Sequence, residues 1–110
     1  MWYDSLRDKA IVQIDGRSVR VTFTHWLQRR HSFTVKADDV SLIEAVQIEP
    51  FTMELILVTK GGSRYAISEE MAGWKDFLEF ARRSFAGFDP NAYESAKGDI
   101  NQTRVCWSQG

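Results

Sequence analysis

The stretch between residues 53 and 85 constrains the fold most, because two apolar runs flank Gly61-Gly62 and an amphipathic pattern follows them. Glycine pairs readily adopt the positive φ angles that tight hairpin turns require. The stretch therefore predicts two antiparallel strands, over residues 53–59 and 63–68, followed directly by a helix.

The predicted register of this hairpin pairs Val58 with Tyr65 and Ile56 with Ile67. Apolar residues then lie on both faces of the first strand. A strand with one solvent-exposed face would instead alternate between apolar and polar residues. We expect a strand that is covered on both sides, as at the centre of a small barrel or sandwich.

Ser68 is the expected N-cap of the helix, because its hydroxyl can accept a hydrogen bond from an amide of the first turn. Glu69 and Glu70 complement the positive end of the helix dipole. Apolar residues at helical spacing predict a face that packs on a sheet. They are Met71, Trp74, Phe77, Leu78, Ala81 and Phe85. Gly73 would permit close approach to a strand.

Asp15-Gly16 predicts a second hairpin, with a two-residue type I′ turn between alternating apolar residues. The expected register pairs Ile14 with Arg17 and Val12 with Val19. It places one set of residues on a common face: Ala10, Val12, Ile14, Val19, Val21 and Phe23.

The remaining elements are shorter. Strands are expected over 32–36 and 41–48, the latter with Ile43, Ala45 and Gln47 on one face. Asp89-Pro90 predicts a short helix over 90–97, and 103–107 has the composition of a last strand.

Composition fits one domain over residues 1–110, because 44% hydrophobic residues supply a core and the net charge is only -1. No basic field favours nucleic acid, so we expect no nucleic-acid partner. One cysteine excludes an internal disulfide and suits a cytoplasmic protein. No apolar run approaches the roughly 18 residues of a membrane span, so no membrane insertion is expected.

Residues that could carry catalysis are few. His25 and His31 share one basic loop, and Cys106 would need one of them within hydrogen-bonding reach to become a nucleophile. The adjacent carboxylates Asp38-Asp39 and Glu69-Glu70 have ordinary explanations, in a turn and at a helix start. We therefore predict no catalytic, cofactor or metal site, and a protein that is not an enzyme.

Charge is distributed unevenly along the chain. Residues 17–36 hold five arginines and lysines and no acid, whereas residues 38–54 hold five acids and no base. Either two neighbouring segments pair their charges across strands, or the basic segment forms a binding face. The candidate interaction surface under the second interpretation is Trp26, Arg29, Arg30 and His31.

The two hairpins, followed by Ser-Glu-Glu-Met-Ala-Gly-Trp and one amphipathic helix, resemble the pleckstrin-homology-like (PH-like) barrel over roughly residues 10–85. They also resemble small uncharacterised bacterial proteins of that architecture. The resemblance implies an α+β fold: an antiparallel, strongly bent sheet or small PH-like barrel of six to seven strands, covered by one C-terminal amphipathic helix, with a short second helix and a last strand. PH-like proteins bind phosphoinositides or peptides with loops at the open end. The long basic loop of phosphoinositide binders is not present in the hairpin around Asp15-Gly16.

The function expected from these features is that of a non-enzymatic bacterial protein-interaction module. It would bind an unknown protein partner, or a second copy of itself, through the basic segment or a sheet edge. One alternative is a small ligand-binding protein or enzyme with a pocket between helix and sheet. Another is an immunity or inhibitor protein that blocks a toxin with its acidic segment, 38–54.

Overall fold

Two antiparallel sheets and two α-helices make up the part of the chain that the computed structural model describes, residues 10–23, 31–48 and 52–109. The elements are β1 (Ile11–Asp15), β2 (Ser18–Phe23), β3 (His31–Lys36), the short 3-10 helix η1 (Ala37–Asp39), β4 (Val40–Ile48), β5 (Thr52–Thr59), β6 (Arg64–Ser68), α2 (Trp74–Ser84), α3 (Pro90–Ala96) and β7 (Arg104–Ser108). Strand order is β1-β2-β3 in one sheet and β6-β5-β4-β7 in the other. The predicted α+β class with antiparallel sheets is confirmed, but the described strands form no closed barrel.

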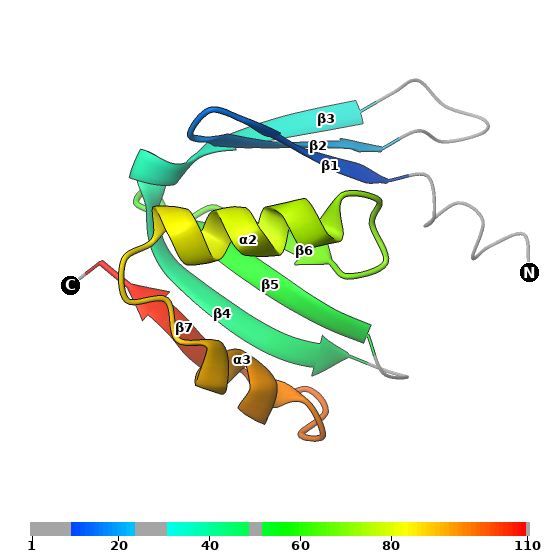
Figure 1. The fold of residues 1–110 in the computed structure, drawn as a ribbon, viewed down its shortest axis with the longest axis vertical. Helices are drawn as coiled ribbons and strands as arrows, with labels where there is room; N and C mark the ends of the chain where they lie inside the picture. Colours follow the sequence, from blue (N-terminus) through cyan, green and yellow to red (C-terminus); the bar gives the residue numbers. More distant parts are fainter. Residues whose placement is uncertain (1–9, 24–30, 49–51, 110) are drawn as a thin grey trace, which may run out of the picture.

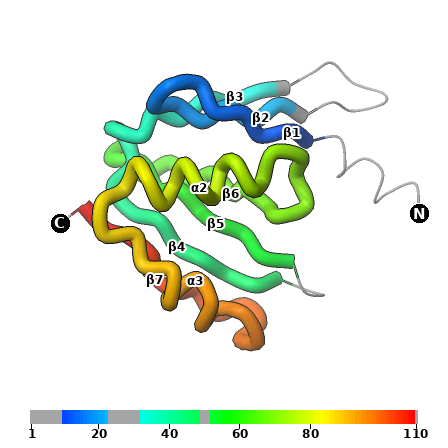
Figure 2. Tube along the Cα trace, in the orientation of Figure 1, coloured from blue at the N-terminus to red at the C-terminus, as the bar shows by residue number. Residues whose placement is uncertain are grey.

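Helix α2 lies between the two sheets, with β1–β3 on one side and β4–β6 on the other (Figure 1). The η1 corner joins β3 to β4, so the chain passes from one sheet to the other at one end of the molecule (Figure 2). Away from the helix the inner faces meet directly, because the rings of Phe33 on β3 and Tyr65 on β6 stack with their centroids 4.6 Å apart.

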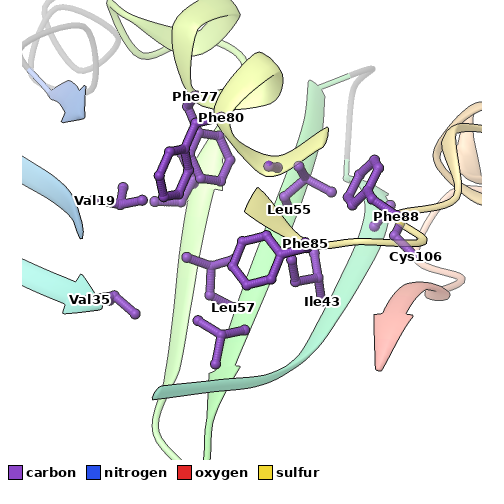
Figure 3. Packing of buried hydrophobic residues seen from close by; sticks show 14 of the residues in the cluster. Val19, Val35, Ile43, Leu55, Leu57, Phe77, Phe80, Phe85, Phe88 and Cys106 are labelled. Carbon is purple, nitrogen blue, oxygen red and sulfur yellow. The ribbon is translucent and has the colours of Figure 1, made fainter. Parts of the chain in front are cut away.

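The core fills the space between the sheets and the helix. Phe77 and Phe80 of α2 are at most 1% exposed and point into this space (Figure 3). Phe80 was missing from the predicted stripe. The inner residues of the sheets are equally buried: Val12, Val19, Val21 and Val35 from the three-stranded sheet, and Ile43, Ala45, Leu55, Leu57 and Ile67 from the four-stranded sheet. Burial of this apolar surface is the main stabilising contribution to the fold.

The first hairpin has a different register from the predicted one. Asp15 pairs with Ser18 and Ile14 with Val19, so the loop residues are Gly16 and Arg17. Gly16, the first loop residue, has a φ of 62°, whereas Arg17, the second, does not have a positive φ, so the turn is of type II′ and not of the predicted type I′, which needs a positive φ at both positions. Because the register moves by two residues, the predicted inner face is kept, and its described valines are buried.

The second hairpin register was wrong by one residue. Leu57 lies opposite Tyr65, and Leu55 lies opposite Ile67. The Thr59 amide donates to the Ser63 carbonyl at 2.8 Å, which leaves a loop of three residues. A slip of one residue exchanges the two faces of a strand. Leu55 and Leu57 therefore point into the core, on the side that the predicted register had given to Ile56 and Val58.

The helix begins later than predicted, at Trp74. The Ser68 hydroxyl accepts a hydrogen bond from the Glu70 amide at 3.1 Å, so it closes a local turn and does not cap the helix. The N-cap is Gly73, with a φ of 90°. A Cβ on this glycine would lie 2.1 Å from the carbonyl oxygen of Val12 in β1, so the predicted close approach to a strand is confirmed.

The short C-terminal elements form as expected. The Asp89 carboxylate accepts from the Asn91 amide at 2.9 Å and caps α3, in which Pro90 is the first residue. Strand β7 pairs antiparallel with β4. It follows that the local signals at this end of the chain were sufficient to locate both elements.

We predict that Gly73→Ala lowers the free energy of unfolding by more than about 2 kcal/mol, because alanine must adopt a left-handed φ and its Cβ collides with the β1 backbone. Gly61→Ala is the matched control. Its Cβ would meet no atom within 4 Å, and its φ lies outside the left-handed region. The control should change stability by less than about 0.5 kcal/mol in urea titrations. Equal losses in the two variants would contradict the packing role of Gly73.

Candidate interaction site

Most of the predicted interaction surface lies outside the described residues. This applies to Trp26, Arg29 and Arg30. His31 is the first residue of β3, where its backbone pairs with Phe23 of β2. The basic segment, residues 17–36, therefore ends in β3, an end strand of the three-stranded sheet.

The two charged segments meet at the η1 corner. Arg17 and Asp38 form an ion pair at 2.9 Å, and both side chains are exposed. Glu44 of the acidic segment pairs instead with Arg64 of β6 at 2.8 Å. Pairing between the segments therefore accounts for Arg17 and Asp38. Such exposed pairs contribute little to stability, so the corner is held mainly by its backbone hydrogen bonds and packing.

Cys106 is a structural cysteine. It is 2% exposed, and burial, with the nearby Asp89 carboxylate, raises the pKa of its thiol to about 11. The thiolate is the nucleophilic form, so this thiol is poorly suited to catalysis near neutral pH. Burial likewise raises the pKa of Tyr93 to about 12. Neither group is poised for proton transfer at pH 7.

The described ranges offer neither a cluster of metal ligands nor a helix that could span a membrane. Residues 10–23, 31–48 and 52–109 contain no group of three or more histidine, cysteine or acidic side chains that could hold a metal ion. Within the same ranges, no helix has both the length and the apolar character needed to cross a membrane.

Two of the four sheet edges are covered by other parts of the chain. On β1, the Val12 amide donates to the Ala72 carbonyl at 2.8 Å, and the Ala72 amide donates to the Ala10 carbonyl at 3.3 Å. On β7, the Cys106 carbonyl accepts from the Asp89 amide at 2.8 Å. These contacts satisfy backbone groups that an end strand would otherwise present to other chains.

The other two edges belong to β3 and β6, and no strand of the described residues pairs with them. The Ala37 amide donates to the Arg17 carbonyl at 2.8 Å, which makes this a hydrogen-bonded pair of the β2–β3 ladder. Such pairs alternate with non-hydrogen-bonded pairs in antiparallel sheets. The register then directs the Val35 backbone toward β2, and the N–H and C=O groups of Thr34 and Lys36 toward the open edge.

The outer edge of β6 is arranged in the same way. The hydrogen bond from the Thr59 amide to the Ser63 carbonyl makes that pair a bonded one. Tyr65 therefore bonds to β5, while the backbone groups of Arg64 and Ala66 point away from the sheet. Both open edges thus offer donors and acceptors in the alternating pattern that an added strand requires.

A cleft of about 470 Å³ lies along the open edge of β3. Its lining comes from β3, the η1 corner and the β5–β6 hairpin: Thr34, Val35, Lys36, Asp39, Thr59, Lys60, Gly61 and Tyr65. Backbone groups of β3, a tyrosine ring and two lysines therefore surround one depression. We name this depression the edge cleft.

A second hollow, of about 400 Å³, corresponds to the predicted pocket between helix and sheet. It lies between β1 and α2 and is lined by Val12, Gln13, Ile14, Asp76, Glu79 and Arg83. The three charged side chains are exposed. Polar groups that stay in water bind a small ligand weakly, so this hollow is the poorer candidate.

The sequence indicated exposed strand edges as binding elements, but it did not indicate which strands form those edges. The usable signal was the alternation in residues 32–36, where polar Ser32, Thr34 and Lys36 interleave with Phe33 and Val35. This pattern predicts a strand with one wet face. It does not reveal that β3 ends its sheet, because that depends on pairing between distant segments.

We predict that Cys106 reacts with iodoacetamide about a hundredfold more slowly in the folded protein than in guanidinium-denatured protein at about pH 8. The rise in its pKa from 9.0 to about 11 lowers the thiolate fraction by that factor, and burial slows access further. Mass spectrometry of timed samples measures both rates. Similar rates in the two samples would show that the thiol is accessible and ionised.

No protein-family model matches the chain, and the comparisons with curated proteins and with solved structures gave no match either.

Proposed function

We propose that the protein is a non-enzymatic interaction module that binds an extended segment of a partner protein along the edge of β3. The observation that carries the proposal is the edge cleft, where the outward backbone groups of Thr34 and Lys36 border a depression. Strand addition of this kind uses main-chain hydrogen bonds for affinity and side-chain pockets for specificity.

The energetics of such binding are adequate for a transient complex. Two outward residues of β3 offer up to four backbone hydrogen bonds, each worth roughly 0.5–1.5 kcal/mol net. Every second side chain of the added strand would face the interior beside Val35 and Tyr65, and would lose contact with water. Tyr65 is half-buried, so its ring has surface left for an apolar neighbour.

We further propose that the module is a PH-like bacterial protein of the cytoplasm. The resemblance to PH-like bacterial proteins is supported by two antiparallel sheets with an amphipathic helix between them, although these sheets stay separate. The buried free thiol of Cys106 suits the reducing cytoplasm. A second copy of the chain could supply the added strand, whereas nucleic acid and membrane lipid are not proposed as partners.

Hydrogen exchange tests the open edges directly. We expect the amides of Thr34, Lys36 and Ala66 to exchange quickly in the free protein, and those of Val35 and Ile67 to be protected by the ladders. A peptide selected from a phage-displayed library of about ten-residue sequences should slow exchange at Thr34 and Lys36, because it forms hydrogen bonds with those groups. Two-dimensional NMR resolves the individual amides.

A proline substitution tests the same edge of β3 by removing one of its outward N–H groups. Thr34→Pro removes the outward N–H without removing a bond to β2, and proline is tolerated on edge strands. We expect it to weaken peptide binding by about tenfold or more, while the control Thr34→Val, which keeps the N–H, binds as the native protein does. Ala66→Pro reports on the β6 edge. Selected peptides that protect neither edge would refute strand addition.

A further inference from the structure

The charged groups around the edge cleft differ from those of the chain as a whole. Lys36 lies on the β3 wall and Lys60 on the hairpin wall, and both side chains are exposed. Neither lysine forms an ion pair within the described residues, whereas Arg17, Arg64, Lys97 and Arg104 do. Asp39 is the one acid of the lining. The cleft is therefore more basic than a chain of net charge -1 would suggest.

Arg20 adds to this basic character. It lies opposite Thr34 in the β2–β3 ladder, so the two side chains share the outer face of the sheet, and Lys36 shares that face two residues further along. An added strand beside β3 would place alternate side chains next to Thr34 and Lys36 on this outer face. Acidic side chains at those positions would meet Lys36 within cross-strand distance.

The inner positions of an added strand have a different environment. Val35 is 2% exposed, and the Tyr65 ring stacks on Phe33 beneath the cleft. Side chains that point inward would contact these groups and leave water, which favours apolar residues. The two environments alternate with the two-residue period of a strand.

We infer that the edge cleft binds an extended peptide segment in which acidic and apolar residues alternate. This inference rests on the proposed function, because it specifies the partner of the same edge. Charge complementarity selects the outer positions of the segment, and burial selects the inner ones. Opposite-charge pairs across strands stabilise pairing, and like charges oppose it.

The test uses two synthetic peptides of about six residues, one alternating glutamate and valine and the other alternating lysine and valine. We expect the glutamate peptide to bind the native protein at least about tenfold more tightly than the lysine peptide, by fluorescence anisotropy at low salt. Added salt should reduce this preference, because the lysines are exposed. Circular dichroism checks that the charge-reversal variants described next keep the native fold.

Charge reversal provides the sharper comparison. Lys36→Glu with Lys60→Glu should invert the preference, so that the lysine peptide binds more tightly. Lys75→Glu with Lys97→Glu changes the net charge equally at positions outside the cleft and should keep the native preference. Equal binding of both peptides, or no binding of the glutamate peptide, would overturn the inference. If library-selected peptides still protected Thr34 and Lys36, strand addition would stand; if none did, the proposed function would fail as well.

Discussion

The fold depends on one packing interaction, the insertion of α2 between the two sheets. Phe77, Phe80 and Ala81 lose nearly all contact with water there, and they contact inner residues of both sheets. The helix can approach β1 closely because its N-cap is a glycine, which leaves room for the Val12 carbonyl. The apolar face of the three-stranded sheet has to be removed from water, and the helix and the second sheet bury it.

The same insertion explains which sheet edges are left open in the described part of the chain. The helix contacts β1, and the segment before it completes the β1 edge through Ala72. At the far side of that sheet, β3 meets the β5–β6 hairpin through side chains such as Phe33 and Tyr65, and no backbone ladder joins the two among the described residues. The apolar core is closed there by rings, while the backbone groups of the edge remain directed outward.

Local sequence patterns predicted the helices and strands well, but they predicted the hairpin registers and the strand order less well. Alternation located the strands, and Asp89-Pro90 located α3, because caps and periodicity are set by neighbours in sequence. The register at Asp15-Gly16 failed because glycine can occupy either position of a two-residue loop, and the register at Gly61-Gly62 failed because a glycine pair fits loops of two or three residues. Ser68 was misassigned because a serine turn and a helix cap use the same hydroxyl. The edge cleft was beyond local patterns, since strand order follows from long-range packing. The surface around Arg29 stays a prediction.

The covered edge at β7 has a consequence for assembly. Its cover is a backbone bond from Asp89, the residue that also caps α3, so the helix and the edge share one anchor. Within the described ranges, each sheet therefore has one end strand that is bonded to another segment and one end strand that is open. Chains that can pair at both ends of a sheet propagate into fibres, whereas a sheet with a single open end stops growing once that end is occupied. Growth through a single sheet therefore stops after one addition, and a fibre would need the open β3 edge of one copy to pair with the open β6 edge of the next.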